Sequence, residues 1–399
     1  MRNILLIIID GLGDEPIPAL GNKTPLEAAK TPNLDFLAKN GICGLVKPTF
    51  STAIPTSEEC HFALFGYDYK NYPVKRGLLT ALGAGIKIKK GDVALRGNFG
   101  TVDKNFDMVD RRAGRITDTN PLIEVLNGMV IEGVKFLIKN AGEHRIGIVM
   151  RGKNLNPQIS DGDLHYGKLE EKIKKILPLK KNQRAVFTAR VLNKFLEKAH
   201  LILKNHPLNK KREKRGLLPA NYILTRGACS LINLPFFKKR YNLKSCCIAG
   251  KNLYKQIGKI LGMDIIEVKG ATGLPNTNLK GKILAAKRVL EKYDFVFLHI
   301  KAADSLAEDG NFFGKKEFIE KIDKNLEPIL RLKDVLIVVT GDHSTCSLLK
   351  SHCKIPIPTL IFGAGRDKIE KFSEKDCKKG KFGKIKQINL MTKILKYGK

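Results

Sequence analysis

The chain has 399 residues, of which 43% are hydrophobic and 28% are charged, and this apolar fraction excludes a wholly disordered protein. Its length exceeds what one small core usually serves, so we expect one large domain or two ordinary ones. The 72 Lys and Arg residues against 39 Asp and Glu give a formal net charge of +33, and only 17 of the 72 are Arg. A protein that grips nucleic acid by planar contacts relies more on Arg, so charge alone supports nucleic-acid binding weakly.

The first apolar run, Ile4–Ile9, is too short to cross a bilayer. It is followed at once by Asp10 and has no small-residue cleavage site, so it predicts a buried strand and no leader or membrane anchor. The eight cysteines contain no Cys-x-x-Cys pair, and the adjacent Cys246 and Cys247 suit neither a disulfide nor a zinc site. We therefore expect a cytoplasmic protein with eight reduced thiols, disulfides in a thermophile being the exception.

Three short apolar runs, β-branched or aromatic and not alternating, predict buried parallel strands. They are Ile4–Ile9, Phe295–Ile300 and Val335–Val339. Acidic residues follow each run within a few positions, namely Asp10, Asp304 and Asp342. Because ligands in open α/β sheets bind beyond the carboxyl ends of the strands, we expect one composite site built from the two extremes of the sequence.

Helical patterns lie between these runs. Thr24-Pro25-Leu26-Glu27 combines a Thr cap, Pro at the first helical position and Glu three residues after the cap, and Thr31-Pro32 opens a second helix. Amphipathic patterns cover residues 168–175 and 191–203.

The middle of the chain differs from its two ends, because its predicted strands are short, mixed with turns and dense in basic residues. Examples of these strands are Val93–Val102, Arg145–Met150 and Asn221–Leu224. We expect residues 91–236 to form a smaller α/β domain. This domain is inserted into an α/β domain of residues 1–90 and 237–399, whose mainly parallel sheet is flanked by helices.

The polar residues near the predicted strand ends combine hard carboxylates with imidazoles, a set that suits two divalent ions such as Mn²⁺ or Zn²⁺. They are Asp10, Asp304, Asp342, His343 and His352. A lone Asp after a strand is more often a helix cap. The Asp-His pair directly after a β run, with a second His nine residues later, is more specific for metal binding.

Ser57 stands where a loop turns into the predicted helix through His61–Phe65. A serine in this place is usually a helix cap. It also suits a nucleophile, because the exposed amides of a helix N-terminus favour a phosphate on its oxygen. A nearby metal ion would lower the pKa of its hydroxyl without a His base. The spacing alone leaves both interpretations open.

Several of the few arginines fall in the central region, where guanidinium groups would bind carboxylate or phosphate by two-point contacts. Surface charge is the alternative for each of them. His165 suits a proton shuttle or a structural histidine equally. The candidates in this region are Asp110-Arg111-Arg112-Ala-Gly-Arg115, Glu143-His144-Arg145, Arg151, Asp161, Asp163, His165, Arg212 and Arg226.

Taken together, these segments resemble the archaeal-type cofactor-independent phosphoglycerate mutases of the alkaline phosphatase superfamily. The motifs run in family order over nearly the whole chain. They include Asp10-Gly-Leu-Gly-Asp14, Lys23-Thr-Pro-Leu-Glu-Ala-Ala-Lys-Thr-Pro-Asn-Leu-Asp35, Pro55-Thr-Ser57, Asp110-Arg-Arg-Ala-Gly-Arg115, Glu143-His-Arg145, Pro219-Ala-Asn221, His299-Ile-Lys-Ala-Ala-Asp304 and Thr340-Gly-Asp-His-Ser-Thr345.

The resemblance implies an alkaline-phosphatase-like α/β domain with an inserted domain that holds the glycerate. It implies interconversion of 3-phosphoglycerate and 2-phosphoglycerate without 2,3-bisphosphoglycerate, through a phosphoserine. Two divalent ions are implied, with Mn²⁺ first and Mg²⁺, Co²⁺ or Zn²⁺ as alternatives. The implied residues are Ser57 as nucleophile, His165 as a catalytic histidine, and Arg112, Arg115, Asp163 and Arg226 for substrate. One metal would be held by Asp10, Ser57, Asp342 and His343, and the other by Asp304, Glu308 and His352.

The sequence departs from the family pattern at three positions. Glu308 stands four residues after Asp304, where relatives usually carry His. A carboxylate can ligate Mn²⁺, Mg²⁺ or Zn²⁺, but it is harder and adds charge. Glu58 stands where Asp is usual, and Cys346 where Pro is usual.

Two other function classes are compatible with the sequence. A metal-dependent phosphatase or a phosphopentomutase-like enzyme of the same superfamily would share the metal site and differ in its product. A basic nucleic-acid-binding protein is the remote alternative, supported by charge only, since the basic runs contain few interleaved aromatics. We expect a small phosphorylated acid as partner, and neither a specific nucleic acid nor a membrane.

Overall fold

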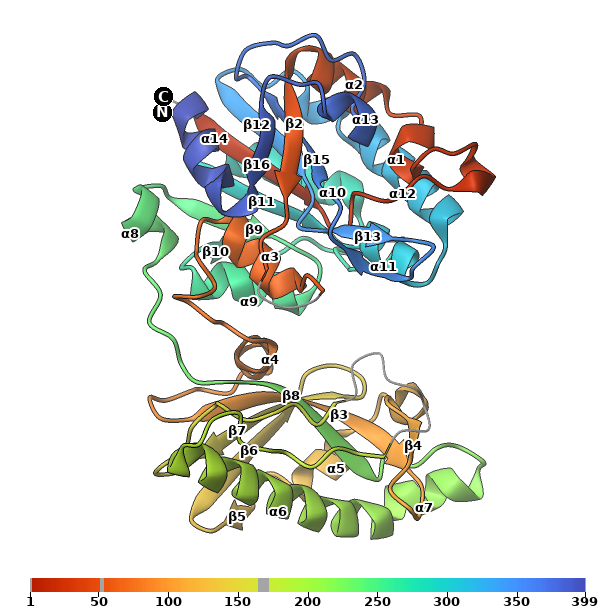
Figure 1. The fold of residues 1–399 in the computed structure, drawn as a ribbon, viewed down its shortest axis with the longest axis vertical. Coiled ribbons are helices and arrows are strands. Elements are labelled where there is room, and N and C mark those ends of the chain that lie inside the picture. Colours follow the sequence, from red (N-terminus) through yellow and green to blue (C-terminus); the bar gives the residue numbers. More distant parts are fainter. Residues whose placement is uncertain (1, 51–53, 164–171, 399) are drawn as a thin grey trace. The chain divides into compact units, whose positions relative to one another are not determined.

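The computed structural model describes residues 2–50, 54–163 and 172–398 (Figure 1). The chain forms two compact units: unit 1 contains Met1–Tyr72 and Leu234–Lys399, and unit 2 contains Pro73–Asn233. Residues 73–90, expected in the outer domain, therefore belong to the inserted unit. The reason is helix α4 (Arg76–Gly83), which packs on the strands of unit 2. A Cβ on Gly77 would lie 2.3 Å from the carbonyl oxygen of Gly227, so only glycine permits this close approach.

The sheet of unit 1 contains the three strands that the sequence predicts, side by side at its centre. In spatial order its strands are β10 (Asp264–Ile265), β9 (Ser245–Ile248), β11 (Phe295–Ile300), β1 (Asn3–Ile9), β12 (Val335–Thr340), β15 (Ile357–Phe362), β2 (Gly41–Lys47) and β16 (Gly383–Lys386). Neighbouring strands run parallel except at β15, which is antiparallel to both of its neighbours. The prediction of a mainly parallel sheet is confirmed.

The central strands are apolar on both faces because both faces are buried. Leu5, Ile7 and Ile9 of β1 join a core that includes side chains of α2, α10 and α12, and the intervening Leu6 and Ile8 are equally buried. The helices of unit 1 are α1 (Pro25–Ala28), α2 (Pro32–Lys39), α3 (Ser57–Leu64), α8 (Phe237–Tyr241), α9 (Asn252–Ile260), α10 (Leu279–Val289), α11 (Ala302–Glu308), α12 (Phe312–Asn325), α13 (Glu374–Cys377) and α14 (Leu390–Gly398).

Helix α1 begins as predicted, with a complete capping box. The Thr24 hydroxyl accepts a hydrogen bond from the Glu27 amide at 3.0 Å, and the Glu27 carboxylate accepts one from the Thr24 amide at 3.1 Å. Helix α2 likewise starts at Pro32.

Unit 2 is built on an antiparallel sheet. Phe136 of the sheet stacks on Phe195 of α6, with ring centroids 4.0 Å apart, in a core between the sheet and this long helix. The strands are β3 (Val93–Val102), β4 (Met108–Asp110), β5 (Val130–Ile131), β6 (Val134–Asn140), β7 (Arg145–Arg151) and β8 (Tyr222–Cys229). Besides α4, the helices are α5 (Asn120–Glu124), α6 (Gln183–Asn205) and α7 (Pro207–Lys214).

Two expectations are wrong. The pattern over residues 168–175 does not form a helix in its described part, because residues 172–175 lie in a bridge and an irregular segment. The cysteines are not all reduced, since Cys346 and Cys353 form a disulfide. The two residues are seven positions apart, and only the hairpin of β13 (Ser344–Cys346) and β14 (Ser351–Cys353) brings them together. No helix in the described ranges is both long and apolar enough to cross a membrane.

Candidate active site

The acidic residues that follow the central strands gather at one edge of the unit 1 sheet. Strand β1 pairs in parallel with both β11 and β12, so the residues beyond all three strands meet at their carboxyl ends. Asp10 directly follows β1, Asp304 lies in the first turn of α11, and Asp342 with His343 follows β12. All four side chains are fully buried, and buried charged groups require partners that compensate for the loss of water.

One group of ligand atoms comes from Asp10, Asp342 and His343, and these atoms lie within 4.8 Å of one another. The Nε2 atom of His343 is 3.2 Å from Asp342 Oδ2 and 3.5 Å from Asp10 Oδ1. Neither of these carboxylate oxygens has a hydrogen-bond partner in the described part of the chain. Burial and the charges of Asp10 and Asp304 raise the pKa of Asp342 well above its usual range. A divalent cation would satisfy these orphaned oxygens, so the donor set fits a metal ion.

A second group contains Asp304, His343 and His352, again within 4.8 Å. His352 Nε2 lies 3.3 Å from Asp304 Oδ1 and 3.6 Å from Glu308 Oε1. Glu308 ends α11, one turn after Asp304, and its side chain is 40% exposed. Burial and the charge of Asp304 raise the pKa of Glu308. The predicted ligand at position 308 therefore lies beside this group, at its exposed side.

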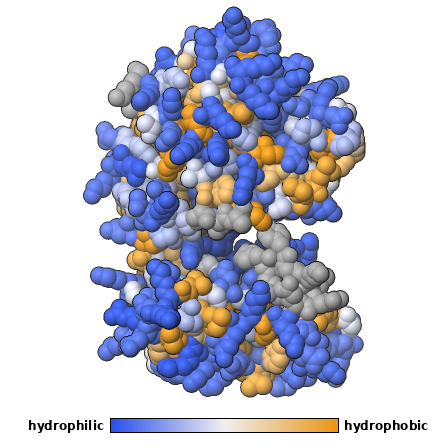
Figure 2. All heavy atoms as spheres, in the orientation of Figure 1, coloured by the Kyte–Doolittle hydropathy of each residue, from blue (hydrophilic) through white to orange (hydrophobic). Residues whose placement is uncertain are grey.

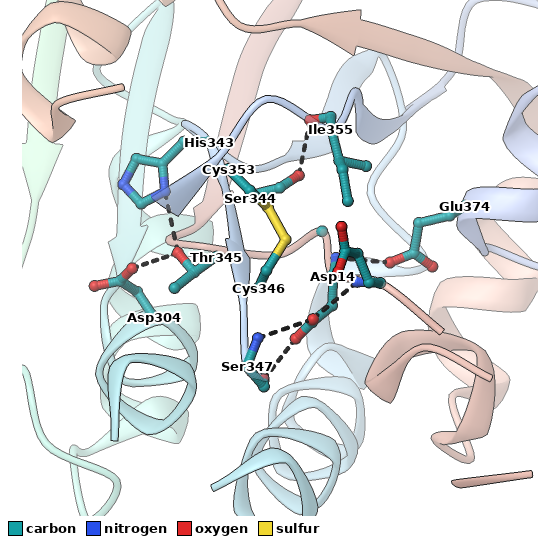
Figure 3. Close-up of a disulfide and its surroundings, with 12 residues drawn as sticks. Asp14, Asp304, His343, Ser344, Thr345, Cys346, Ser347, Cys353, Ile355 and Glu374 are labelled. Atoms are coloured by element: carbon teal, nitrogen blue, oxygen red, sulfur yellow. Dashed lines mark hydrogen bonds between the residues drawn. A yellow bond between two sulfur atoms is a disulfide. The ribbon is translucent and has the colours of Figure 1, made fainter. Parts of the chain in front are cut away.

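Hydrogen bonds show which ring nitrogen of His343 and of His352 carries the proton when the imidazole is neutral. The Thr345 hydroxyl lies 2.6 Å from Asp304 Oδ1 and 3.2 Å from His343 Nδ1 (Figure 3). An ionised carboxylate only accepts, so the single hydroxyl proton goes to Asp304 and the hydroxyl accepts from a protonated Nδ1 of His343. His352 Nδ1 lies 2.7 Å from the Pro55 carbonyl oxygen, which also only accepts. In its neutral form, each histidine therefore keeps its proton on Nδ1 and offers Nε2 to a metal ion.

Ser57 is the first residue of α3, and it is not the helix cap. Thr56 takes that place, because its hydroxyl accepts a hydrogen bond from the Glu59 amide at 3.4 Å. The buried Ser57 Oγ lies 3.4 Å from His343 Nε2, next to the first group of ligand atoms. One turn later, His61 Nδ1 contacts the Ser57 carbonyl oxygen at 2.7 Å. Burial and the charge of His299 lower the pKa of His61 to about 3, so this imidazole is neutral.

Three residues around Asp10 belong to the site without having been predicted as site residues. The Tyr254 hydroxyl donates a hydrogen bond to Asp10 Oδ2, and His299 Nε2 lies 3.1 Å from the same oxygen. The Lys301 ammonium lies 3.5 Å from it and forms an ion pair with Asp304. Burial disfavours the charge on Lys301, but Asp10 and Asp304 outweigh it and raise its pKa well above the usual range. His299 lies in β11 and Lys301 directly follows it, and both belong to the motif His299-Ile-Lys-Ala-Ala-Asp304, so the sequence contained a signal for them. No local pattern marks Tyr254, which lies in α9.

In unit 2, two arginines contact the carboxylate of Asp163. Its Oδ1 accepts hydrogen bonds from Arg111 Nε at 3.1 Å and Nη2 at 2.5 Å. Its Oδ2 lies 3.6 Å from Arg226 Nε. Arg112 and Arg115 are exposed in the turn after β4. The predicted Asp163 and Arg226 are therefore brought together, and Arg111 of the Asp110–Arg115 motif joins them.

Further basic side chains make unit 2 locally positive. Burial and the charges of Arg226, Arg76 and Arg145 lower the pKa of Arg96 well below its usual range. Burial and several arginines, Arg145 first, lower the pKa of His144 to about 3. Burial is the largest cause of both shifts, and the neighbouring arginines add to it, so several positive charges lie close together here, as an anion-binding site requires.

Two of the central arginines serve the fold instead. Arg151 pairs with Asp92 at 2.7 Å, and Arg212 donates hydrogen bonds to the carbonyl oxygens of Leu218 and Ala113. The predicted catalytic His165 lies outside the described residues.

Comparison with known proteins agrees with this geometry. A family model described as the metalloenzyme superfamily matches residues 2–397. A 2,3-bisphosphoglycerate-independent phosphoglycerate mutase from Archaeoglobus fulgidus is 43% identical over 398 residues, which cover 98% of this chain and 96% of the relative. An enzyme of the same name from Sulfolobus acidocaldarius is 40% identical over 402 residues, covering 99% of this chain and 97% of the relative.

Two solved structures share the fold. A protein from Pyrococcus horikoshii superposes with a TM-score of 0.84 at 32% identity, covering 100% of this chain and 97% of that one. A cofactor-independent phosphoglycerate mutase from Thermoplasma acidophilum superposes with a TM-score of 0.71 at 34% identity, covering 100% of both chains. These likenesses confirm the predicted α/β fold class and the family resemblance. The chain belongs to the archaeal-type 2,3-bisphosphoglycerate-independent phosphoglycerate mutases, within the metalloenzyme superfamily.

Proposed function

We propose that this chain interconverts 3-phosphoglycerate and 2-phosphoglycerate through a phosphoserine at Ser57, without 2,3-bisphosphoglycerate. Membership of the family makes the chain an isomerase. The observation that carries the role of Ser57 is its position: its hydroxyl is buried, free of the capping role that Thr56 fills, and 3.4 Å from His343 Nε2. The amides of the first turn of α3 favour the phosphate that Ser57 would carry.

We also propose the two ligand sets of the metal centre. Asp10, Ser57, Asp342 and His343 would hold one divalent ion, and Asp304, Glu308 and His352 the other. The orphaned oxygens of Asp10 and Asp342 support the first set, and the approach of His352 to Asp304 and Glu308 supports the second. Bound divalent ions would withdraw charge from phosphoryl oxygens and lower the pKa of the Ser57 hydroxyl. Mn²⁺ is our first choice, and Mg²⁺, Co²⁺ and Zn²⁺ also suit these ligands.

The arginines of unit 2 would bind the anionic groups of the acid. Arg226 and Arg111 are oriented by Asp163, and Arg112 and Arg115 lie in the turn after β4. Guanidinium groups fit carboxylate and phosphate by paired hydrogen bonds, so they would hold the glycerate while its phosphoryl group is on Ser57. His165 stays a prediction as a second catalytic residue. A small phosphorylated acid in the cytoplasm is the partner that this chemistry implies.

The test is an enolase-coupled assay on metal-stripped protein. It receives 3-phosphoglycerate and one divalent ion at a time, with no bisphosphoglycerate present, while free phosphate is measured in parallel. A mutase converts the substrate and releases little phosphate. Release of phosphate as the main product would instead identify a phosphatase.

Ser57→Ala tests the nucleophile in the same assay. We expect this variant to lose turnover and to keep its fold, because it removes the covalent path and no cap. Ser230→Ala, in a loop of unit 2, is the matched control and keeps turnover. Circular dichroism checks the fold of both variants. Normal turnover by folded Ser57→Ala would contradict the assignment.

A further inference from the structure

The disulfide lies on the hairpin that carries one of the ligand histidines. Strands β13 and β14 pair antiparallel, with Thr345 directly opposite His352. Because successive side chains of a strand point to opposite faces, Thr345 and His352 share one face, and Cys346 and Cys353 share the other. Figure 3 shows the bond between the two sulfur atoms beside Thr345. The disulfide is therefore a diagonal cross-link on the face of the hairpin opposite Thr345 and His352.

The face of the hairpin that carries Thr345 and His352 contacts both groups of ligand atoms. Thr345 bonds Asp304 and His343, as described above, and His352 approaches Asp304. The rings of His343 and His352 stack with centroids 3.7 Å apart. A shift of β14 against β13 would thus move one ligand directly and disturb the contacts of two more.

Apart from the disulfide, few contacts hold β14 in place. The ladder joins only three residues of each strand, and a short two-stranded ribbon is marginally stable in water. All three residues of β14 are partly exposed, and Leu348 and Leu349 at the hairpin tip are 53% and 60% exposed. Outside the hairpin, His352 bonds the Pro55 carbonyl oxygen at 2.7 Å, and its Nε2 lies 3.3 Å from Asp304 and 3.6 Å from Glu308.

We propose that Cys346 and Cys353 are positioning residues of the metal centre: their disulfide holds His352 at Asp304, and its reduction weakens metal binding there. The claim that bound ions support turnover rests on the proposed function, whereas metal binding can be measured independently of turnover. A phosphine reductant breaks the S–S bond and forms two thiols. Water supplies the two protons and the oxygen that converts the phosphine to its oxide.

The experiment compares three forms of the full metal-free chain: oxidised, phosphine-reduced with the phosphine removed anaerobically, and the Cys346→Ser/Cys353→Ser double variant. Mn²⁺ is titrated into each form, and free Mn²⁺ is followed by electron paramagnetic resonance. We expect six free thiols in the oxidised protein. We expect the dissociation constant of the weaker Mn²⁺ site to rise about 10–100-fold on reduction, as it does when groups that orient metal ligands are removed. The double variant should bind like the reduced protein and not respond to phosphine.

Cys229→Ser is the matched control, because Cys229 is a buried free thiol in unit 2. It should bind Mn²⁺ like the wild type in both redox states. Equal affinity of the oxidised and reduced wild type would overturn the proposal even if the double variant fails to fold, and so would eight free thiols in the oxidised protein. Absence of mutase turnover in every form, with the difference in Mn²⁺ affinity intact, would contradict the proposed function and leave this inference standing.

Discussion

At the scale of single residues, one hydroxyl links the two groups of ligand atoms. Thr345 donates to Asp304 and accepts from His343, so a single proton position orients a ligand of each group. Its side chain is fully buried, which keeps water from competing for either bond.

Thr345→Val should therefore weaken metal binding while leaving the fold intact. Valine keeps the shape of threonine and removes the hydroxyl, so Asp304 loses a donor and His343 loses the acceptor that holds its proton on Nδ1. We expect the dissociation constant for Mn²⁺ to rise about 10–100-fold, measured from free Mn²⁺ by electron paramagnetic resonance. Thr345→Ser keeps the hydroxyl and should bind Mn²⁺ like the wild type. Equal affinity of the Val and wild-type proteins would show that the hydroxyl does not orient these ligands.

Glu308 should set the choice of metal. It replaces a neutral imidazole by a carboxylate 3.6 Å from His352, and oxygen-rich sites favour harder ions. We expect Glu308→His to move the metal–activity profile towards Zn²⁺ and Co²⁺, and Glu308→Ala to lose one ion, as measured by metal analysis of the purified protein. Two tightly bound ions in Glu308→Ala, with an unchanged profile, would leave Asp309 or a water molecule to fill the position.

At the scale of elements, a buried polar network joins segments that lie far apart in the sequence. Asp14 accepts a hydrogen bond from the Ser347 hydroxyl of the hairpin turn at 2.6 Å (Figure 3). It also binds the Lys315 ammonium of α12 at 2.9 Å. Glu374, the first residue of α13, accepts hydrogen bonds from the Asp14 amide at 3.3 Å and the Thr24 hydroxyl at 2.7 Å. The network thus ties the loop after β1 to α1, α12, α13 and the hairpin that carries His352.

Glu374 should make stability depend on pH. Burial raises the pKa of Glu374 from 4.5 to about 7. Between these two pH values, Glu374 is therefore protonated in the folded protein and ionised in the unfolded chain. The contribution is complete below pH 4.5 and is lost as the pH rises through 7, an effect of up to about 3 kcal/mol. Glu374→Gln places a neutral amide there and should remove this part of the decrease in the free energy of unfolding with rising pH. Urea unfolding of the metal-free protein at pH 5 and pH 8 measures it, and identical pH dependence in both proteins would exclude Glu374 as its source.

The sequence predicts elements well where the signal is local. The three buried strands and the capping box at Thr24 follow from runs and spacings within a few residues, and they were found at those positions. Helix α4 was assigned to the wrong unit because its partners, such as Gly227, are far away in the chain. The disulfide was missed because β13 and β14 are too short for a periodic signal. Tyr254 was missed because only the packing of α9 brings its hydroxyl to Asp10.

At the scale of the whole molecule, Lys and Arg have different tasks. The formal net charge of +33 comes mostly from Lys, and Figure 2 shows hydrophilic side chains over much of the visible face of each unit. Such a charge raises the encounter rate with any anion and carries no specificity. In unit 2, Asp163 contacts Arg111 and Arg226, and burial together with neighbouring arginines lowers the pKa of Arg96 and His144. We therefore expect specificity for a phosphorylated acid to come from these few guanidinium groups.

Arg226→Ala should accordingly lower kcat/KM for 3-phosphoglycerate at least about 30-fold, the loss of about 2 kcal/mol that accompanies removal of one buried charge partner. Arg226→Lys should recover little of it, because an ammonium cannot make the two-point contact. Arg288→Ala is the matched control: it removes the same charge from an exposed position of α10, so net charge changes equally in both variants. Steady-state kinetics at fixed ionic strength compare the three. If Arg226→Ala and Arg288→Ala gave the same kcat and KM as the wild type, attraction by net charge would be sufficient and the arginines of unit 2 would be ordinary surface charge.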